Sequence, residues 1–111
     1  MSASEEWVRV ASVDELKEGE LKEVIVSDQQ VCLGNVGGEF LAIGNICSHE
    51  YVELSDGWLE GDEVECPAHG SLFSMRTGEV RGMPATSPVP AYEVKVEGED
   101  VYVRGPGTAA P

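Results

Sequence analysis

The segments that decide the fold of this chain are Cys47-Ser48-His49 and Cys66-Pro67-Ala68-His69. Together they give the pattern C-x-H, sixteen intervening residues, then C-x-x-H. The chain has only two histidines, and each follows a different cysteine by two or three positions. Two loops that each offer one thiolate and one imidazole are suited to hold a small metal centre between them.

Two kinds of metal centre use this set of donors. In a binuclear 2Fe–2S centre, one iron takes both sulfur atoms and the other iron takes both nitrogen atoms. A Cys2His2 zinc site uses the same four side chains. Zinc sites, however, usually place two cysteines in one loop and two histidines in the other. The mixed pairs therefore favour the iron–sulfur cluster, with a zinc site or an empty site as the alternatives.

The length and charge of the chain limit its organisation and its partners. A chain of 111 residues makes one domain with a modest core. We therefore expect a single domain over residues 1–111, with loose tails at 1–6 and 105–111. No apolar run approaches the roughly 18 residues of a membrane span, and no secretory signal is visible, so we expect a soluble, cytoplasmic protein. The formal charge of −14 argues against nucleic acid and against anionic membranes as partners.

An acidic run separates the two Cys/His pairs. Its seven carboxylates are Glu50, Glu53, Asp56, Glu60, Asp62, Glu63 and Glu65, and the segment contains no Lys or Arg. Such a run is either a solvated surface or a collar that steers a basic redox partner toward the metal centre. The third cysteine, Cys32, lies in an apolar stretch and is expected to act as a small buried hydrophobic residue.

Short apolar runs between turn residues predict an all-β protein, because no helical period persists beyond about two turns. Ser12 and Glu15 form a capping-box pair, which predicts one helical turn ended by Gly19. Residues 82–90 contain three prolines and are expected to be an extended loop without a strand. The predicted strands cover residues 7–11, 21–26, 30–36, 39–43, 58–59, 63–66, 71–74, 92–97 and 101–104, with a hairpin turn at 35–38.

These motifs resemble the Rieske family, and most closely the small ferredoxins of bacterial ring-hydroxylating oxygenase systems. The resemblance covers nearly the whole chain and is strongest over residues 47–50, 54–59, 65–70, 73–78 and 82–85. It implies the Rieske (ISP-type) fold, in which antiparallel β-sheets or a sandwich support a cluster-binding subdomain of two loops. It also implies that Ser71, Phe73 and Pro84 surround the cluster, with Phe73 at the position of a tyrosine in the quinol-oxidising branch.

The expected function is a soluble one-electron carrier with one Rieske-type 2Fe–2S cluster. Cys47 and Cys66 would bind one iron, and His49 and His69 the other. The resemblance implies that the carrier takes electrons from a flavin-containing reductase and passes them to a terminal oxygenase. We expect a monomer that is an electron-transfer component and not an enzyme by itself. The alternatives are a Rieske-like small subunit of a nitrite reductase or another oxidoreductase complex, and a zinc-stabilised interaction module.

Overall fold

The computed structural model describes residues 6–47, 51–68, 70–83 and 87–105. In these ranges the regular structure consists of β-strands and two short 3₁₀ turns, so the all-β prediction is confirmed. The turns are η1 (Val13–Glu15) and η2 (Leu54–Asp56). The strands are β1 (Val8–Ser12), β2 (Leu21–Val26), β3 (Gln29–Val36), β4 (Glu39–Gly44), β5 (Trp58–Glu60), β6 (Glu63–Glu65), β7 (Leu72–Ser74), β8 (Val80–Gly82), β9 (Ala91–Glu97) and β10 (Asp100–Arg104).

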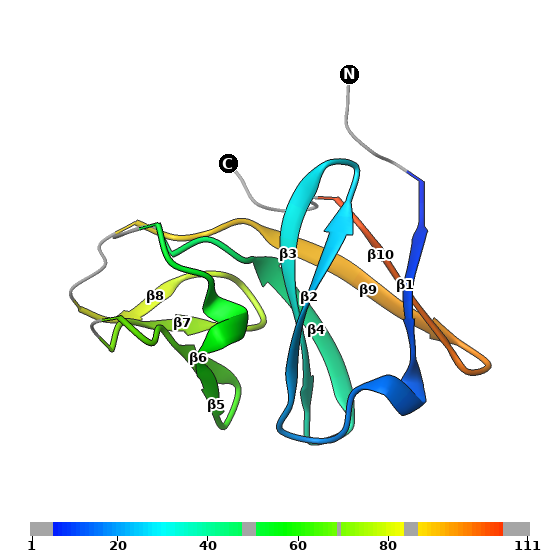
Figure 1. Ribbon diagram of the computed structural model, residues 1–111, viewed down its shortest axis with the longest axis horizontal. Helices are drawn as coiled ribbons and strands as arrows, with labels where there is room; N and C mark the ends of the chain where they lie inside the picture. Colours follow the sequence, from blue (N-terminus) through cyan, green and yellow to red (C-terminus); the bar gives the residue numbers. More distant parts are fainter. Residues whose placement is uncertain (1–5, 48–50, 69, 84–86, 106–111) are drawn as a thin grey trace.

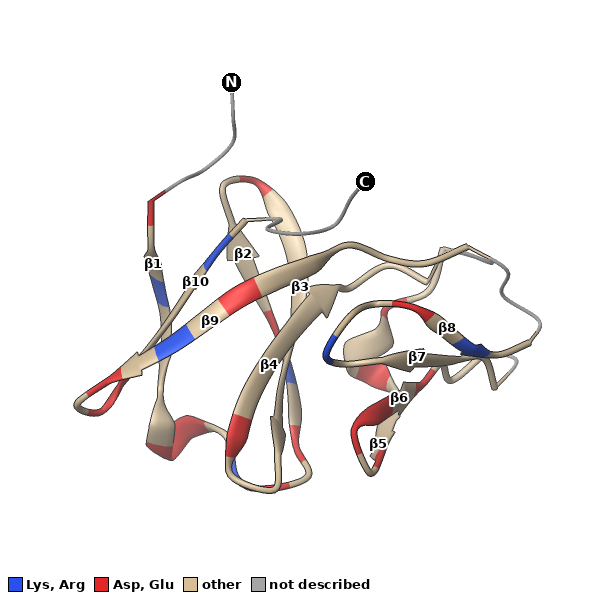
Figure 2. Cartoon of the chain, turned by 180° about the vertical axis from the view of Figure 1, so that it is seen from behind, with Lys and Arg blue, Asp and Glu red and all other residues tan. Residues whose placement is uncertain are grey.

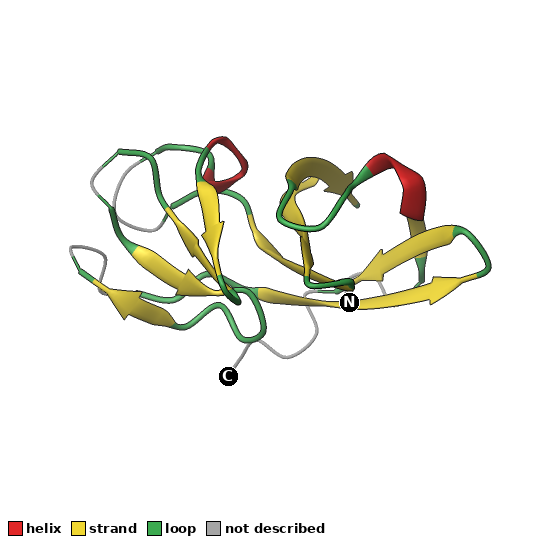
Figure 3. Cartoon of the chain, turned by 90° about the horizontal axis from the view of Figure 1, so that it is seen from below, coloured by secondary structure: helices red, strands yellow, loops and turns green. Residues whose placement is uncertain are grey.

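The strands form two antiparallel sheets, which lie side by side (Figures 1 and 3). The larger one, here called the base sheet, has the order β1-β10-β9-β4-β3-β2. Its edge strands β1 and β2 contact each other, so the sheet curls around its own core. The smaller one, the cluster sheet, has the order β5-β6-β7-β8 and follows β4 in the chain. Within the described residues no helix is long and apolar enough to cross a membrane.

Strands β3 and β4 separate two hydrophobic cores. Val31 and Leu33 of β3 point into the core of the base sheet, whereas Cys32 between them belongs to the second core. On β4, Ala42 belongs to the core of the base sheet and Ile43 to the second core. Successive side chains of a strand point to opposite faces, so a strand covered on both faces is a continuous buried run. The second core therefore joins the base sheet to the cluster sheet.

Two hairpins of the base sheet are closed by tight two-residue turns. Gly37 and Gly38 both have positive φ, and the Gly38 N–H donates to Asn35 Oδ1 at 2.8 Å, so the predicted hairpin turn is confirmed. Ser27 and Asp28 also have positive φ, between β2 and β3. This two-residue turn lacks the glycine that usually marks such a hairpin.

Two local predictions were wrong. The predicted helical turn is present as η1, but it ends before Gly19 and the Ser12 side chain makes no capping hydrogen bond to it. The Glu15 carboxylate instead lies 3.5 Å from Lys22 Nζ. Strand β8 was not predicted, and it ends at Gly82, inside the segment expected to have no strand. Residues 87–90 of that segment carry no strand, and residues 84–86 lie outside the described residues, as do 1–5 and 106–111 of the predicted tails.

Candidate metal centre

The first cysteine follows β4 on a strand-like extension. Ile46 forms an isolated antiparallel bridge with Glu53, and the Cys47 N–H donates to the Val52 carbonyl at 2.9 Å. The Leu54 N–H donates to the Asn45 carbonyl at 2.6 Å, so residues 45–47 and 52–54 run antiparallel. Cys47 is therefore held at the root of a closed loop.

The second cysteine follows β6 and begins a similar loop. The Cys66 N–H donates to the Ser71 carbonyl at 2.8 Å, and the Gly70 N–H donates to the Cys66 carbonyl at 3.1 Å. Gly70 has φ +82°, a conformation that a residue with a Cβ rarely adopts. The loop returns the chain to β7, so Cys66 also lies at a loop root.

The structure brings the two cysteines into one buried cluster. Cys47 is 4% exposed and Cys66 is 2% exposed, and both belong to the second hydrophobic core. Neither is part of a disulfide bond. Buried cysteines at the roots of adjacent loops fit thiolate ligation of a shared metal centre, because the surrounding core excludes water from the sulfur atoms. His49 and His69, the predicted nitrogen ligands, lie outside the described residues.

Of the three residues predicted to surround the metal centre, Ser71 and Phe73 are described by the structure and Pro84 is not. Ser71 is 1% exposed, and its carbonyl closes the second loop. Phe73 is fully buried in the second core, opposite Val64 of β6. Pro84 lies outside the described residues. In the part of the chain that the structure describes, no three His, Cys, Asp or Glu residues are grouped as metal ligands, and both histidines fall outside that search.

Gly57 determines how closely the first loop approaches the second. It ends η2, and its N–H donates to the Leu54 carbonyl at 2.9 Å. A Cβ atom at this position would collide with the backbone carbonyl of Glu65 and would lie 3.2 Å from the Pro67 ring. Those residues flank Cys66 on both sides. Gly57 therefore allows close packing of the segment after the first loop against the root of the second.

The acidic run is partly neutralised by arginines from β8 and from the turn before it. Arg76 Nε lies 3.1 Å from Asp62, and Arg76 Nη1 lies 3.0 Å from Glu39 of β4, so this side chain also joins the two sheets. These carboxylates raise the pKa of Arg76, Glu39 more than Asp62. Arg81 lies 3.7 Å from Glu63. Figure 2 shows cationic segments among the acidic segments of the cluster sheet.

Three carboxylates of the acidic run make neither an ion pair nor a side-chain hydrogen bond within the described part of the chain. They are Glu53, Asp56 and Glu60, and the last two are exposed. Glu65 accepts a hydrogen bond from Trp58 Nε1 at 3.1 Å. The sequence alone therefore overstated the free negative charge of this segment, because Arg76 and Arg81 from outside it pair with two of its carboxylates.

Cys32 behaves as the sequence predicted. It is fully buried in the second core and is not disulfide-bonded. Burial, and to a smaller extent the charge of Glu23, raise the pKa of its thiol to about 12. The thiol is therefore neutral at physiological pH.

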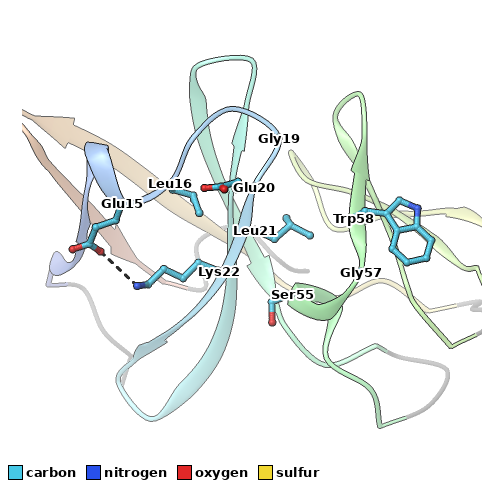
Figure 4. Close-up of a pocket in the computed structure, with 9 residues that line it drawn as sticks. All are labelled: Glu15, Leu16, Gly19, Glu20, Leu21, Lys22, Ser55, Gly57 and Trp58. Carbon is cyan, nitrogen blue, oxygen red and sulfur yellow. Dashed lines mark hydrogen bonds and ion pairs between the residues drawn. The ribbon is translucent and has the colours of Figure 1, made fainter.

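A pocket of about 470 Å³ lies between the η1–β2 segment and the η2–β5 segment (Figure 4). Its lining includes Lys22, which is paired with Glu15, and the partly exposed Trp58. Neither Cys47 nor Cys66 lines it. Ser55 and Gly57, which border the two cluster loops, do line it, so the pocket lies beside the candidate metal centre without including the cysteines.

The comparison with known families decides between the two kinds of metal centre. Residues 6–93 match the family model of the Rieske [2Fe-2S] domain. The chain belongs to this family. The predicted Rieske fold and its single 2Fe–2S cluster are thus confirmed, and the zinc alternative was wrong.

Similar proteins of the Rieske family are named as electron-transfer components. The ferredoxin component of the naphthalene 1,2-dioxygenase system of Pseudomonas aeruginosa is 37% identical over 100 residues, which cover 90% of this chain and 96% of that protein. The ferredoxin of carbazole 1,9a-dioxygenase from Nocardioides aromaticivorans IC177 has a TM-score of 0.84 and 37% identity, covering 87% of this chain and 95% of its own. The prediction of an electron-transfer component, not an enzyme by itself, is confirmed.

A further solved structure contains a ferredoxin together with its oxygenase. It is described as a complex of reduced oxygenase and oxidised ferredoxin in carbazole 1,9a-dioxygenase. The matched chain has a TM-score of 0.83 and 34% identity, and the match covers 89% of this chain and 93% of that chain.

Sequence reasoning found the cysteines but missed the residues that support them. Asn45, Gly57 and Arg76 were not singled out as parts of the site. Asn45 precedes Cys47 by two residues, and its position inside an apolar run was an available signal, because a buried amide requires partners. The partners themselves come from distant parts of the chain.

Proposed function

We propose that this chain is the cytoplasmic ferredoxin of a ring-hydroxylating oxygenase system. It acts as a monomer and a single Rieske domain over residues 1–111, taking single electrons from a flavin-containing reductase and passing them to a terminal oxygenase. The observation that carries the proposal is the pair of buried, non-bridged cysteines at the roots of two loops in one core. The similarity to oxygenase ferredoxins over about nine tenths of the chain supports the choice of partners.

The proposed ligands are Cys47 and Cys66 on one iron, and His49 and His69 on the other. The two cysteines fit this role because their sulfur atoms share a dry core and are not used in a disulfide. Each histidine follows its cysteine within a loop whose root is fixed by backbone hydrogen bonds. This distribution gives each loop one thiolate and one imidazole.

When bound, the cluster supplies reversible one-electron chemistry, and reduction adds one negative charge. The residues around the cluster set the reduction potential at which it accepts that charge. The second core shields the cysteine side from water, which favours approach of a redox partner from the opposite side. Ser71 offers a buried hydroxyl beside the second loop, whereas Phe73 offers only an apolar ring. We propose that this pair gives a potential in the lower half of the Rieske range, because fewer donors stabilise the added charge.

The ligand assignment is tested by single substitutions with a matched control. Cys47→Ser and Cys66→Ser should give colourless protein without the 2Fe–2S spectrum and with lower thermal stability, since metal binding contributes to folding. Cys32→Ser serves as the control, because this cysteine is buried in the same core but is not a proposed ligand. It should retain the red-brown colour and the electron paramagnetic resonance signal. Retention of the cluster in both ligand variants would contradict the assignment.

The role as a carrier is tested by reconstitution. The purified protein should be reduced by a flavin-containing ferredoxin reductase and should restore product formation by a ring-hydroxylating oxygenase that lacks its ferredoxin. A protein that holds the cluster but supports no turnover with any such pair would exclude this function. In that case a subunit role in another oxidoreductase complex would be favoured.

A further inference from the structure

We propose that Glu23 lowers the reduction potential of the cluster by holding a negative charge against Asn45, the residue that supports the Cys47 loop. Glu23 lies on β2 of the base sheet and is far from both cluster loops in the sequence. Its hydrogen bond to Asn45 places its charge beside the Cys47 loop, so it is a tuning residue and not a ligand. The inference rests on the proposed role of Cys47 as a ligand.

Three polar side chains converge between the base sheet and the first loop. Glu23 Oε2 accepts a hydrogen bond from Gln30 Nε2 at 2.8 Å and another from Asn45 Nδ2 at 3.2 Å. Glu23 is only partly exposed, and it pairs with Cys32 across β2 and β3. These two amide donors on one carboxylate oxygen fix the Glu23 carboxylate beside Asn45.

Asn45 connects this carboxylate to the loop that carries Cys47. Its side chain is fully buried, and its Oδ1 accepts a hydrogen bond from the Ser55 N–H at 2.8 Å. Its backbone donates to the Gln30 carbonyl at 3.0 Å and accepts from the Leu54 N–H at 2.6 Å. Two residues span at most about 7 Å, so Cys47 lies close to this network.

The charge of Glu23 acts on the core that contains the proposed ligands. It contributes, after burial, to the raised pKa of the Cys32 thiol, which means that it opposes a negative charge at that position. Cys32 belongs to the same buried cluster as Cys47 and Cys66. Reduction also adds a negative charge at the end of this core, so the same carboxylate disfavours reduction.

The hydrogen bonds alone do not require a charge at this position. A glutamine would offer a carbonyl oxygen of the same reach to Gln30 and Asn45. The feature that only glutamate supplies is its negative charge, partly shielded from water by the two sheets. Glu23→Gln therefore separates the electrostatic role from the structural one.

The test compares the reduction potentials of Glu23→Gln, Glu97→Gln and the unchanged protein by protein-film voltammetry. Glu97 is an exposed residue at the end of β9, paired with Lys95 at 3.2 Å, so its substitution changes the charge equally at a distant place. We expect a higher potential for Glu23→Gln and no shift for Glu97→Gln. Equal potentials in all three proteins, or equal shifts in both variants, would overturn the inference.

A second measurement excludes a structural explanation. Hydrogen exchange of the Ser55 N–H, followed by mass spectrometry, reports whether its bond to Asn45 persists. Unchanged protection together with a raised potential supports the tuning role. Loss of this protection together with the raised potential would overturn it, because the loop itself would then have moved. Both outcomes are read on variants that contain a full complement of cluster. Failure of the ligand assignment would instead show in the cysteine variants, as a cluster that is retained.

Discussion

Replacement of Gly57 by alanine should distort the root of the second cluster loop. The φ of Gly57 is −91°, so alanine meets no left-handed backbone strain there, and the cost arises from the collision with the Glu65 carbonyl. Overpacking of this kind costs about 1–3 kcal/mol. For a domain of this size, each kcal/mol lowers the melting temperature by about 4–8 °C, so the expected decrease is about 4–24 °C. The electron paramagnetic resonance signal of the reduced cluster should also change, because Glu65 precedes Cys66.

Gly34→Ala is the matched control for this experiment. Its new Cβ atom would meet the ends of the Leu21 and Met75 side chains at 3.0 Å, and flexible side-chain ends move more easily than a backbone carbonyl. Thermal unfolding of the holoprotein should therefore show a smaller loss for Gly34→Ala, with an unchanged resonance signal. If Gly57→Ala were as stable as Gly34→Ala and had the same signal as the unchanged protein, the proposed close contact between the two loops would be refuted.

Two other predictions concern the buried thiol and the unpaired carboxylates. Because the pKa of Cys32 is raised to about 12 in the folded state, its contribution to stability is complete below its unfolded pKa near 9 and is lost as pH rises toward 12. Between pH 9 and 12, the free energy of unfolding measured in urea should therefore fall about 1.4 kcal/mol per pH unit more steeply for the unchanged protein than for Cys32→Ala. Equal slopes would show that the thiol does not titrate in this way. Joint neutralisation of Glu53, Asp56 and Glu60 should slow reduction by the cognate reductase roughly tenfold at low salt and hardly at all at 1 M salt. A rate independent of salt in both proteins would favour a merely solvated surface.

Most strands could be predicted because their apolar residues give a local signal. Strands β2, β3 and β4 are rich in Val, Ile, Leu and Phe, and their observed bounds differ from the predicted ones by at most one residue. Strand β8 has only Val80 as an apolar side chain and is followed by prolines, so nothing local marks it. It forms because β7 offers a free edge, to which Val80 and Gly82 pair opposite Phe73 and Leu72.

The support of the metal centre could not be predicted, because it depends on contacts between distant segments. Asn45 is held by Glu23 of β2 and by Ser55 after the first loop. Arg76 reaches Glu39 of β4, 37 positions earlier. A sequence shows that such polar residues exist, but the register of two sheets decides which of them meet. The cysteines were recognisable because their spacing within the chain is itself the signal.

The distribution of charge explains how such a carrier could serve two partners. All seven cationic side chains lie in the described part of the chain, and six of them pair with carboxylates: Arg9, Lys22, Arg76, Arg81, Lys95 and Arg104. The surface therefore presents mainly unpaired negative charge, which opposes association between copies of this chain and supports the proposed monomer. If the salt test identifies the acidic run as the docking surface, the reductase and the oxygenase both present cations to the same side of the cluster sheet. Because they then compete for one surface, the carrier must leave the first partner before it binds the second.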